Sequence, residues 1–248
     1  MISISINPAY KYLRSFIESV PERFGEGRLI YGGRNEIRVF NVGGKELNVK
    51  RYRVPAFFNR LVYSFFRKSK GERAFEYPAL LAAAGIDTPE AIAYIEERLG
   101  GLIAYSYFIS PQISQGKDIY WLGDADPAGL ADFIHDFARF AARMHEAGVL
   151  HLDFSPGNIL CYKAEDGKWH FTVIDINRMR FGDVDARRGC ENFARLWAQP
   201  GFFRALAREY AAVRGADPEQ CERWTMEARN RFWRRFSKHH NVCYNLVY

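Results

Sequence analysis

The sequence lacks the cysteine pattern of a zinc site or of a disulfide framework. Its four cysteines, Cys161, Cys190, Cys221 and Cys243, are widely scattered over 248 residues. Structural zinc sites need cysteine or histidine ligands in closely spaced pairs, and disulfide frameworks belong mostly to small secreted domains. The scattered thiols fit a reducing compartment, so we expect a cytoplasmic protein.

Long hydrophobic runs are also missing. The segment Met1–Pro8 has neither a basic flank nor an apolar core, so we expect no signal peptide. The longest apolar stretches, such as Pro78–Ile86, are far shorter than the ~20 residues of a membrane-spanning helix. No internal repeat or low-complexity tract is visible. The sequence therefore predicts a globular chain that at most lies on a membrane surface.

The composition supplies a core and an excess of positive charge. Hydrophobic residues make up 48% of the chain, which excludes a disordered protein. The formal net charge is +6, and such an excess permits a nucleotide, a phosphosugar, a nucleic acid or an anionic membrane surface as partner. Because no nucleic-acid recognition motif is present, no nucleic-acid partner is expected.

The first part of the chain reads mainly as strands. Five runs alternate or are rich in β-forming residues, and they cover residues 29–31, 36–42, 45–52, 91–96 and 102–107. Gly43-Gly44 and Gly100-Gly101 separate two pairs of these runs, which predicts hairpins. One helix is expected to end near Gly85. These patterns predict a small β-rich N-lobe, residues 1–108, with a five-stranded sheet and a helix.

The remainder reads mainly as helices. Phe133, Phe137, Phe140 and Met144 recur at helical spacing between residues 127 and 148. A short hairpin follows over residues 158–176, and further helices are expected over 191–198, 202–213 and 218–238. This pattern predicts a larger helical C-lobe, residues 109–248, and a bilobal α+β chain.

The strongest motif lies between the long helix and that hairpin. His151, Asp153 and Asn158 have the spacing His-x-Asp-x4-Asn, and Asp175 ends the next strand. This arrangement resembles the catalytic segment of the protein-kinase-like superfamily. The resemblance implies that Asp153 orients the acceptor hydroxyl and accepts its proton, while Asn158 and Asp175 bind Mg²⁺ through hard oxygens. His151 is expected to brace the loop by hydrogen bonding.

The same resemblance implies nucleotide-binding residues upstream. Lys50, in an alternating strand, is the candidate for holding the α- and β-phosphates of ATP. Glu76 is the candidate partner of Lys50, and Glu72, one turn earlier, is the alternative. Gly32 and Gly33 would allow a loop to approach the phosphates closely.

Arg34 follows this glycine pair and adds a charge that would contact phosphate. The loop lacks the Gly-x-Gly-x-x-Gly pattern, so a plain hairpin turn is an equally good interpretation of it.

More of the chain resembles the lipopolysaccharide core kinases, which phosphorylate Kdo or heptose of the inner core. The similar segments are residues 69–76, 85–92, 151–160 and 174–181, and the resemblance spans roughly residues 25–200. It implies transfer of phosphate from ATP, with Mg²⁺, to a sugar hydroxyl of lipopolysaccharide. It also implies a cytoplasmic enzyme that is peripheral on the inner membrane.

Several residues depart from a eukaryotic-type protein kinase. Leu152 replaces the arginine before the catalytic aspartate, and Ser155 stands where a phosphate-binding lysine is usual. Asp175-Ile176-Asn177 replaces Asp-Phe-Gly, and Asn177 is expected to adopt the positive φ of the missing glycine. No Ala-Pro-Glu segment follows. A protein kinase or an aminoglycoside-type kinase remains an alternative, and a pseudokinase binding module is the alternative of another class.

Two stretches combine basic and large apolar residues, residues 51–70 and 229–238. Each could lie on an anionic membrane surface. Each could equally be an amphipathic helix that packs its aromatic side chains inward. The sequence does not separate these interpretations.

Overall fold

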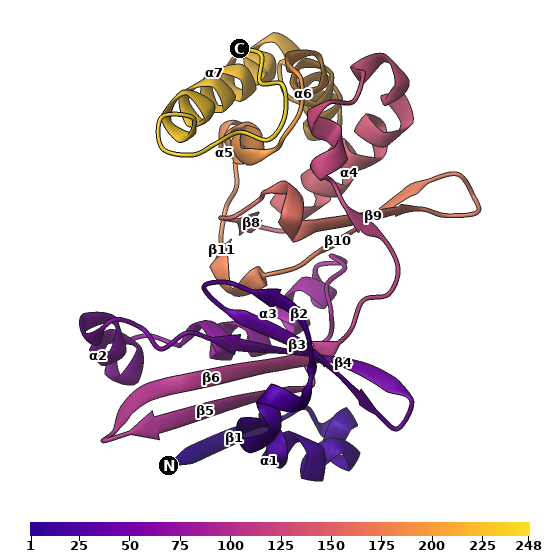
Figure 1. The fold of residues 1–248 in the computed structure, drawn as a ribbon. Coiled ribbons are helices and arrows are strands. Elements are labelled where there is room, and N and C mark those ends of the chain that lie inside the picture. The colour runs from indigo at the N-terminus through magenta and orange to yellow at the C-terminus, as the bar shows by residue number, and fades with distance from the viewer. The chain divides into compact units, whose positions relative to one another are not determined.

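The structure is a computed structural model that describes residues 1–248. The chain forms two compact units (Figure 1). The first comprises Met1–Ala83 and Thr88–Ser114, and the second comprises Ala84–Asp87 and Gln115–Tyr248. The chain therefore passes between the units three times. The division into functional lobes after residue 108 stays a prediction.

The first unit contains one antiparallel sheet with the strand order β1-β5-β6-β4-β3-β2. Its strands are β1 (Ile2–Ile6), β2 (Arg28–Gly32), β3 (Glu36–Val42), β4 (Lys45–Tyr52), β5 (Ala93–Leu99) and β6 (Leu102–Pro111). The sequence predicts only five strands. The sixth, β1, places Ile4 opposite Ile95 on β5. It was missed because a short Ile/Ser alternation at a chain end is a weak strand signal without its partner.

Two glycine pairs close the predicted hairpins. Gly43-Gly44, between β3 and β4, have φ values of 58° and 79°, and Gly100-Gly101, between β5 and β6, have 59° and 78°. Positive φ at both central positions matches the twist of the flanking strands. These turns fix the register of β4 and β6, the strands from which the candidate site of this unit is built.

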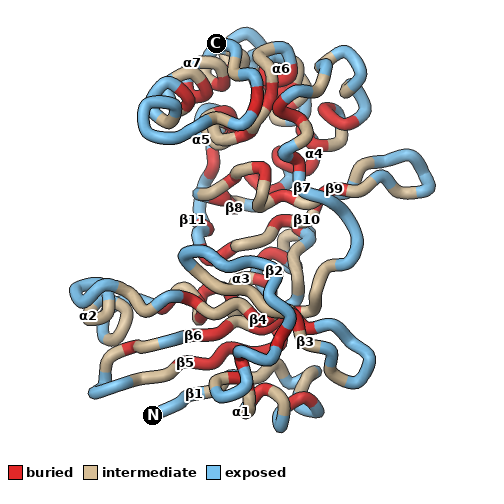
Figure 2. The backbone as a smooth tube through the Cα atoms, in the orientation of Figure 1, coloured by how far each residue is buried: buried red, intermediate tan, exposed pale blue.

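Helices pack on the sheet of the first unit. They are α1 (Arg14–Arg23), α2 (Phe57–Phe65) and α3 (Lys70–Ala83). Ile17 and Val20 of α1 form a buried cluster with Val49 of β4 and Ile95 of β5, and the buried stretches of β5 and β6 are visible in Figure 2. On α3, Gly71 lies so close to the sheet that a Cβ there would be 2.6 Å from the ring of Tyr94.

The second unit is mainly helical. Its helices are α4 (Ala131–Glu146), α5 (Ala186–Asn192), α6 (Pro200–Arg214) and α7 (Pro218–Phe236). Its short strands form one sheet of order β10-β9-β7 and one pair of β11 with β8. These strands are β7 (Lys117–Asp118), β8 (Val149–His151), β9 (Ile159–Lys163), β10 (Trp169–Val173) and β11 (Met179–Phe181). None of the helices in the molecule has the length and apolarity needed to cross a membrane.

The core of the second unit is aromatic. Phe133, Phe137, Phe140 and Met144 lie buried along one side of α4, which confirms the predicted helical spacing. The ring of Phe171, on β10, lies between 5.1 and 5.3 Å from those of Phe133, Phe137 and Phe140. This packing fixes the hairpin of β9 and β10 on the helix, and the hairpin carries the candidate catalytic residues.

A second buried group on α4 is polar. His145 is 1% exposed, and its ring nitrogens lie 2.9 Å from the Tyr210 hydroxyl and 3.2 Å from Oδ1 of Asn192. Burial lowers the pKa of His145 to about 4, because charging the ring inside the protein is unfavourable. Gly189 of α5 faces the same tyrosine, and a Cβ there would lie 1.9 Å from the Tyr210 hydroxyl oxygen.

The segment Ala84–Asp87 belongs to the second unit because of its contacts with β10. The backbone oxygen of Asp87 accepts a 3.0 Å hydrogen bond from the Val173 amide. The Asp87 carboxylate accepts a hydrogen bond from the hydroxyl of Thr172. A residue from the first hundred therefore supports the strand that ends at Asp175.

Candidate active site

The candidate catalytic loop leaves β8 at His151 and enters β9 after Asn158. Phe154 within it is fully buried, and its ring stacks on Phe137 at 5.8 Å. Pro156 is also buried, whereas the Asp153 side chain keeps 22% of its surface exposed. The loop is therefore anchored through Phe154 and Pro156, and Asp153 stays accessible.

His151 connects this loop to the end of β10. Its ring is fully buried, Nδ1 accepts a 3.1 Å hydrogen bond from the Asp153 amide, and Nε2 lies 3.1 Å from the backbone oxygen of Ile174. These partners require the neutral tautomer with the proton on Nε2. Burial lowers the pKa of His151, which favours that neutral form. The contacts are the bracing contacts expected from the sequence, while a part in catalysis stays a prediction.

The carboxylate of Asp153 lies between two arginines. Arg195 Nη1 lies 2.5 Å from Oδ1, and Arg178 Nη1 lies 3.3 Å from Oδ2. The two cations neutralise the local charge and fix the carboxylate plane. Neither arginine was a candidate from the sequence. Arg178 could have been found from the sequence, because it lies only three residues after Asp175. Arg195 could not, because it reaches Asp153 only through the position of α5 and the turn after it.

Asn158 and Asp175 lie on adjoining segments. Asn158 Nδ2 donates to the Asp153 backbone oxygen at 2.9 Å and to Ser155 Oγ at 3.3 Å. The backbone oxygen of Asn158 accepts from the Ile174 amide at 3.0 Å, directly before Asp175. Hydrogen bonds therefore join His151, Asp153 and Asn158 to the backbone of Ile174, the residue directly before Asp175.

The backbone of Asp175 is left-handed, with φ of 54° and ψ of 43°. It is the only residue other than glycine with positive φ, a conformation that costs about 1–3 kcal/mol and is concentrated at functional sites. The sequence placed the positive φ at Asn177, and this expectation is wrong. Asn177 instead lies in a short helical turn and donates a hydrogen bond to Oδ1 of Asp175, which stabilises the left-handed residue.

The chemistry of this donor set fits Mg²⁺. Because the Asn158 amide nitrogen is held by two acceptors, its Oδ1 is oriented away from them. Asp175 supplies a carboxylate on the neighbouring segment. Mg²⁺ is typically bound by one or two such protein oxygens together with water and substrate phosphates. No group of three or more His, Cys, Asp or Glu side chains in the molecule forms a cluster able to hold a metal ion, so the site would depend on these two side chains with water and phosphate oxygens.

In the first unit, Lys50 lies on β4 with its side chain on one defined face of the sheet. Lys50 pairs with Phe108 on β6, which pairs with Tyr94 on β5, so the three side chains share a face. This is the face on which Gly71 of α3 packs against Tyr94. Lys50 Nζ lies 5.4 Å from the ring centroid of Tyr52. The alternation predicted for this strand is correct, because Leu47 and Val49 are buried on the opposite face.

The two candidate glutamates lie on α3. Glu76 forms a bidentate ion pair with Lys68, with one oxygen 2.6 Å from Nζ, and its pairing with Lys50 stays a prediction. Glu72 lies in the first turn of the helix, and its amide donates to Ser69 Oγ at 3.1 Å. Ser69 thus caps α3, as the Ser-x-x-Glu pattern favours.

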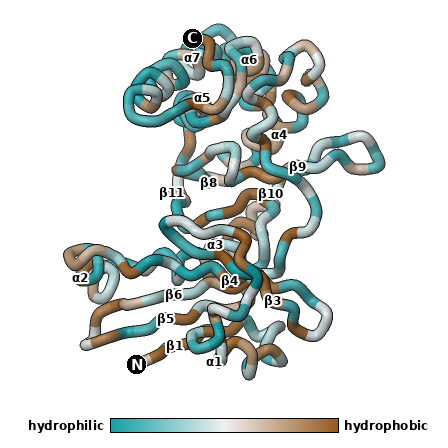
Figure 3. Tube along the Cα trace, viewed as in Figure 1, coloured by the Kyte–Doolittle hydropathy of each residue, from teal (hydrophilic) through white to brown (hydrophobic).

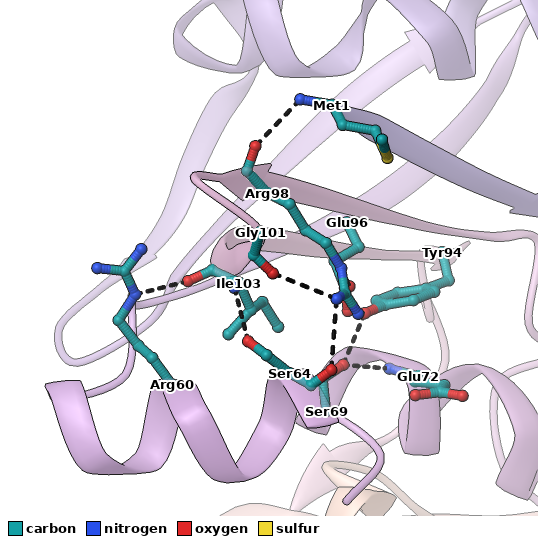
Figure 4. A network of polar contacts seen from close by, with 10 residues as sticks. All are labelled: Met1, Arg60, Ser64, Ser69, Glu72, Tyr94, Glu96, Arg98, Gly101 and Ile103. Carbon is teal, nitrogen blue, oxygen red and sulfur yellow. Dashed lines mark hydrogen bonds and ion pairs between the residues drawn. The ribbon is translucent and has the colours of Figure 1, made fainter. Parts of the chain in front are cut away.

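A buried polar network holds this capped end on the sheet (Figure 4). The hydroxyls of Ser69 and Tyr94 lie 2.6 Å apart, and Tyr94 also donates to the Glu96 carboxylate. Glu96 is only 5% exposed, and Arg98 Nε lies 2.7 Å from its other oxygen. Burial, together with the contact to Glu96, raises the pKa of Tyr94, so the phenol stays protonated. The start of α3 is therefore fixed relative to β5.

A pocket of about 560 Å³ opens beside this end of α3. Its cationic lining residues are Arg34, Arg53 and Lys70, and no acidic side chain lines it. Gly32 ends β2, and the Gly33 amide bonds to the Asn35 backbone oxygen at 3.0 Å. The loop predicted to cover phosphates therefore contributes Arg34 to a positively charged pocket.

Comparison with known proteins defines the class. The structure of WaaP in complex with acyl carrier protein has 16% sequence identity to this chain and a TM-score of 0.61, and it covers 96% of this chain and 100% of its own. The PknI kinase domain of Mycobacterium tuberculosis shows 14% identity, coverage of 83% and 93%, and a TM-score of 0.42. No curated protein sequence matches significantly. The similarity to WaaP confirms the predicted α+β, protein-kinase-like fold.

The family follows from the sequence itself. Residues 24–210 match the model of the lipopolysaccharide kinase (Kdo/WaaP) family. The chain belongs to this family and is a phosphotransferase, as its resemblance to the core kinases indicates. The family is named for lipopolysaccharide and not for proteins, which favours a sugar acceptor over a peptide.

Proposed function

We propose that this chain transfers the γ-phosphate of ATP, with Mg²⁺, to a hydroxyl of a lipopolysaccharide inner-core sugar, Kdo or heptose. One observation carries the proposal. Asp153 and Asn158 belong to a hydrogen-bonded network that includes the backbone of Ile174, directly before Asp175, in a chain that matches the lipopolysaccharide kinase family.

In this proposal Asp153 acts on the acceptor. Its carboxylate orients the sugar hydroxyl and takes the proton as the oxygen bonds to the γ-phosphorus, while the bond to the bridging oxygen breaks and ADP leaves. Arg178 and Arg195 are positioning residues, because they touch the carboxylate and hold its orientation. The chemistry needs placement and charge neutralisation more than covalent help.

The remaining candidates bind the nucleotide. Asn158 Oδ1 and Asp175 would hold Mg²⁺, which neutralises phosphate charge when bound. Lys50 would bind the α- and β-phosphates, and Gly32, Gly33 and Arg34 would cover them. Glu76 would hold Lys50 only after exchanging its present partner Lys68.

Replacement of the proposed base tests this function. Purified Asp153→Ala, given labelled ATP and delipidated core oligosaccharide, should lose transfer by about 10²–10⁴-fold. It should keep a Mg²⁺-dependent thermal shift with nucleotide. Asp166→Ala, at an exposed turn of the β9–β10 hairpin, is the matched control and should transfer normally. Near-normal transfer by Asp153→Ala would show that the assigned role is wrong.

The acceptor is tested in parallel. Delipidated peptides and an aminoglycoside, offered with the core oligosaccharide, separate the alternative kinase functions. A nucleotide-dependent melting shift without turnover on any acceptor would favour a pseudokinase. Mass spectrometry of lipid A–core from cells with and without the gene should differ by one phosphate.

Location and partners complete the proposal. Because inner-core sugars are attached to lipid A, we place the activity on the cytoplasmic face of the inner membrane. The structurally similar WaaP forms a complex with acyl carrier protein. Acyl carrier protein is therefore the protein partner that we propose for this chain, and co-elution of the two from a sizing column tests it.

A further inference from the structure

Helix α2 packs on the rest of its unit through its polar side. Arg60 Nε donates to the backbone oxygen of Ile103 at 2.8 Å, and Ser64 Oγ, one turn later, accepts from the Ile103 amide at 2.9 Å (Figure 4). Arg98 Nη1 reaches the Ser64 backbone oxygen at 3.4 Å. Residues four apart lie on the same side of a helix, so the side of Arg60 and Ser64 faces the start of β6.

The opposite side of α2 is apolar and exposed. Phe58 is 81% exposed and Phe65 is 64% exposed, and no residue of α2 is buried. At about 100° per residue, Phe57, Phe58, Leu61, Val62 and Phe65 fall on one half of the helix. Figure 2 shows α2 as largely exposed, and Figure 3 shows hydrophobic turns in it. Surface helices normally turn their apolar side toward the protein. Helix α2 does the reverse: its polar side faces the sheet and its apolar side faces solvent.

Positive charge surrounds this apolar side. Residues 53–71 contain five basic and no acidic residues. Arg53 and Arg67 are exposed and form no ion pair. Lys68 is neutralised by Glu76, whereas Arg67 is not. An apolar side next to such a cation complements a surface that is apolar below and anionic above, which is the boundary of an anionic bilayer.

The other basic and aromatic stretch, residues 229–238, does not offer such a surface. Arg229 and Trp233 on α7 are fully buried. The Trp233 ring packs against Trp197, Phe236 and Tyr244 at 5.3–5.9 Å. Of the two interpretations left open by the sequence, inward packing is therefore correct for this stretch, whereas it fails for α2.

We infer that α2 binds an anionic phospholipid bilayer, with Phe58, Phe65 and Phe66 at the headgroup boundary and Arg67 among the lipid phosphates. The inference rests on the proposed function only in the choice of a bilayer over another anionic partner, because the proposed acceptor is lipid-linked. Figure 1 shows α2 at one side of the first unit, and its exposed side chains are accessible to a flat surface.

Vesicle sedimentation of the full chain tests the inference. Wild type should sediment with vesicles of phosphatidylcholine and phosphatidylglycerol, and sediment less with phosphatidylcholine alone. The double variant Phe58→Gln/Phe66→Gln should bind about 100-fold more weakly, at about tenfold per phenylalanine. Arg67→Glu should bind about tenfold more weakly.

Leu80→Gln on α3 and Arg235→Glu on α7 are matched controls, because both residues are exposed. They should sediment as wild type. The phenylalanine variant should still phosphorylate delipidated core oligosaccharide, since its side chains lie outside the candidate active site. This arm separates the two proposals: loss of membrane binding with retained transfer supports the inference.

Three results would overturn it. They are equal sedimentation of wild type and the double variant, equal loss in the α7 control, and binding of acyl carrier protein, instead of vesicles, through Phe58 and Phe66. Failure of wild type to phosphorylate any core sugar would instead contradict the proposed function and leave the sedimentation result intact.

Discussion

Replacing His151 by leucine would remove the bridge between the candidate catalytic loop and β10. The change leaves two partly buried backbone groups, the Asp153 amide and the Ile174 carbonyl, without their hydrogen bonds of 3.1 Å each. An unsatisfied buried group costs about 1–3 kcal/mol, so we expect His151→Leu to lose about 2–5 kcal/mol of the free energy of unfolding. That is a large part of the ~5–15 kcal/mol that stabilises a typical domain.

Urea unfolding at neutral pH measures this loss. His170→Leu is the matched control, because His170 on β10 is exposed and surface changes of this kind stay within about 0.5 kcal/mol. His151→Gln should recover part of the loss, since an amide both donates and accepts.

Transfer to core oligosaccharide is the second readout. If His151 positions Asp153, the turnover number of folded His151→Leu should fall more than its KM rises. A free energy of unfolding equal to that of His170→Leu would refute the bridging role.

Three further outcomes follow from buried groups. The first concerns His145, which in the folded chain stays neutral down to about pH 4. As pH falls below about 6.5, the ordinary pKa of histidine, this residue takes up a proton in the unfolded chain only, so the free energy of unfolding should drop by about 3 kcal/mol between these two pH values. Urea unfolding should show a shallower pH dependence for His145→Gln than for wild type, and identical pH profiles would contradict this. Tyr94→Phe should lose about 2 kcal/mol of the free energy of unfolding, because the buried Glu96 carboxylate loses a hydrogen-bond donor. Thermal unfolding measures this loss, with Tyr31→Phe at an exposed position as the control. Equal melting temperatures of the two variants would count against the network. Gly189→Ala should fold poorly because its Cβ would overlap the Tyr210 hydroxyl, whereas Gly129→Ala meets no atom within 4 Å; equal soluble yield and melting of the two would show that the overlap is relieved.

Local patterns predicted much of the fold and of the site. The glycine pairs specify their turns because positive φ at two successive positions favours glycine. The spacing from His151 to Asn158 is short enough for the sequence to specify one loop. The helical spacing of Phe133, Phe137 and Phe140 predicts a helix with one buried side, whichever apolar element packs against it.

The features of the candidate site that the sequence did not predict depend on contacts between residues far apart in the chain. Arg195 and Asp153 are 42 residues apart and meet only through tertiary packing. Glu76 has several cations within reach along the chain, and its choice of Lys68 depends on where β4 and α3 lie. The positive φ falls on Asp175, whose carboxylate accepts a hydrogen bond from the Asn177 side chain, and residue propensity alone does not reveal this arrangement.

The path of the chain limits how this enzyme can be dissected. A fragment starting at Gln115 would contain all of the proposed catalytic loop but would lack Asp87. The Val173 amide and the Thr172 hydroxyl would then lose their acceptors, two residues from the strained backbone at Asp175. Excising the helical half would therefore loosen the strand end that presents the carboxylate proposed to bind the metal, so inactivity of such a fragment would say nothing about where the nucleotide binds.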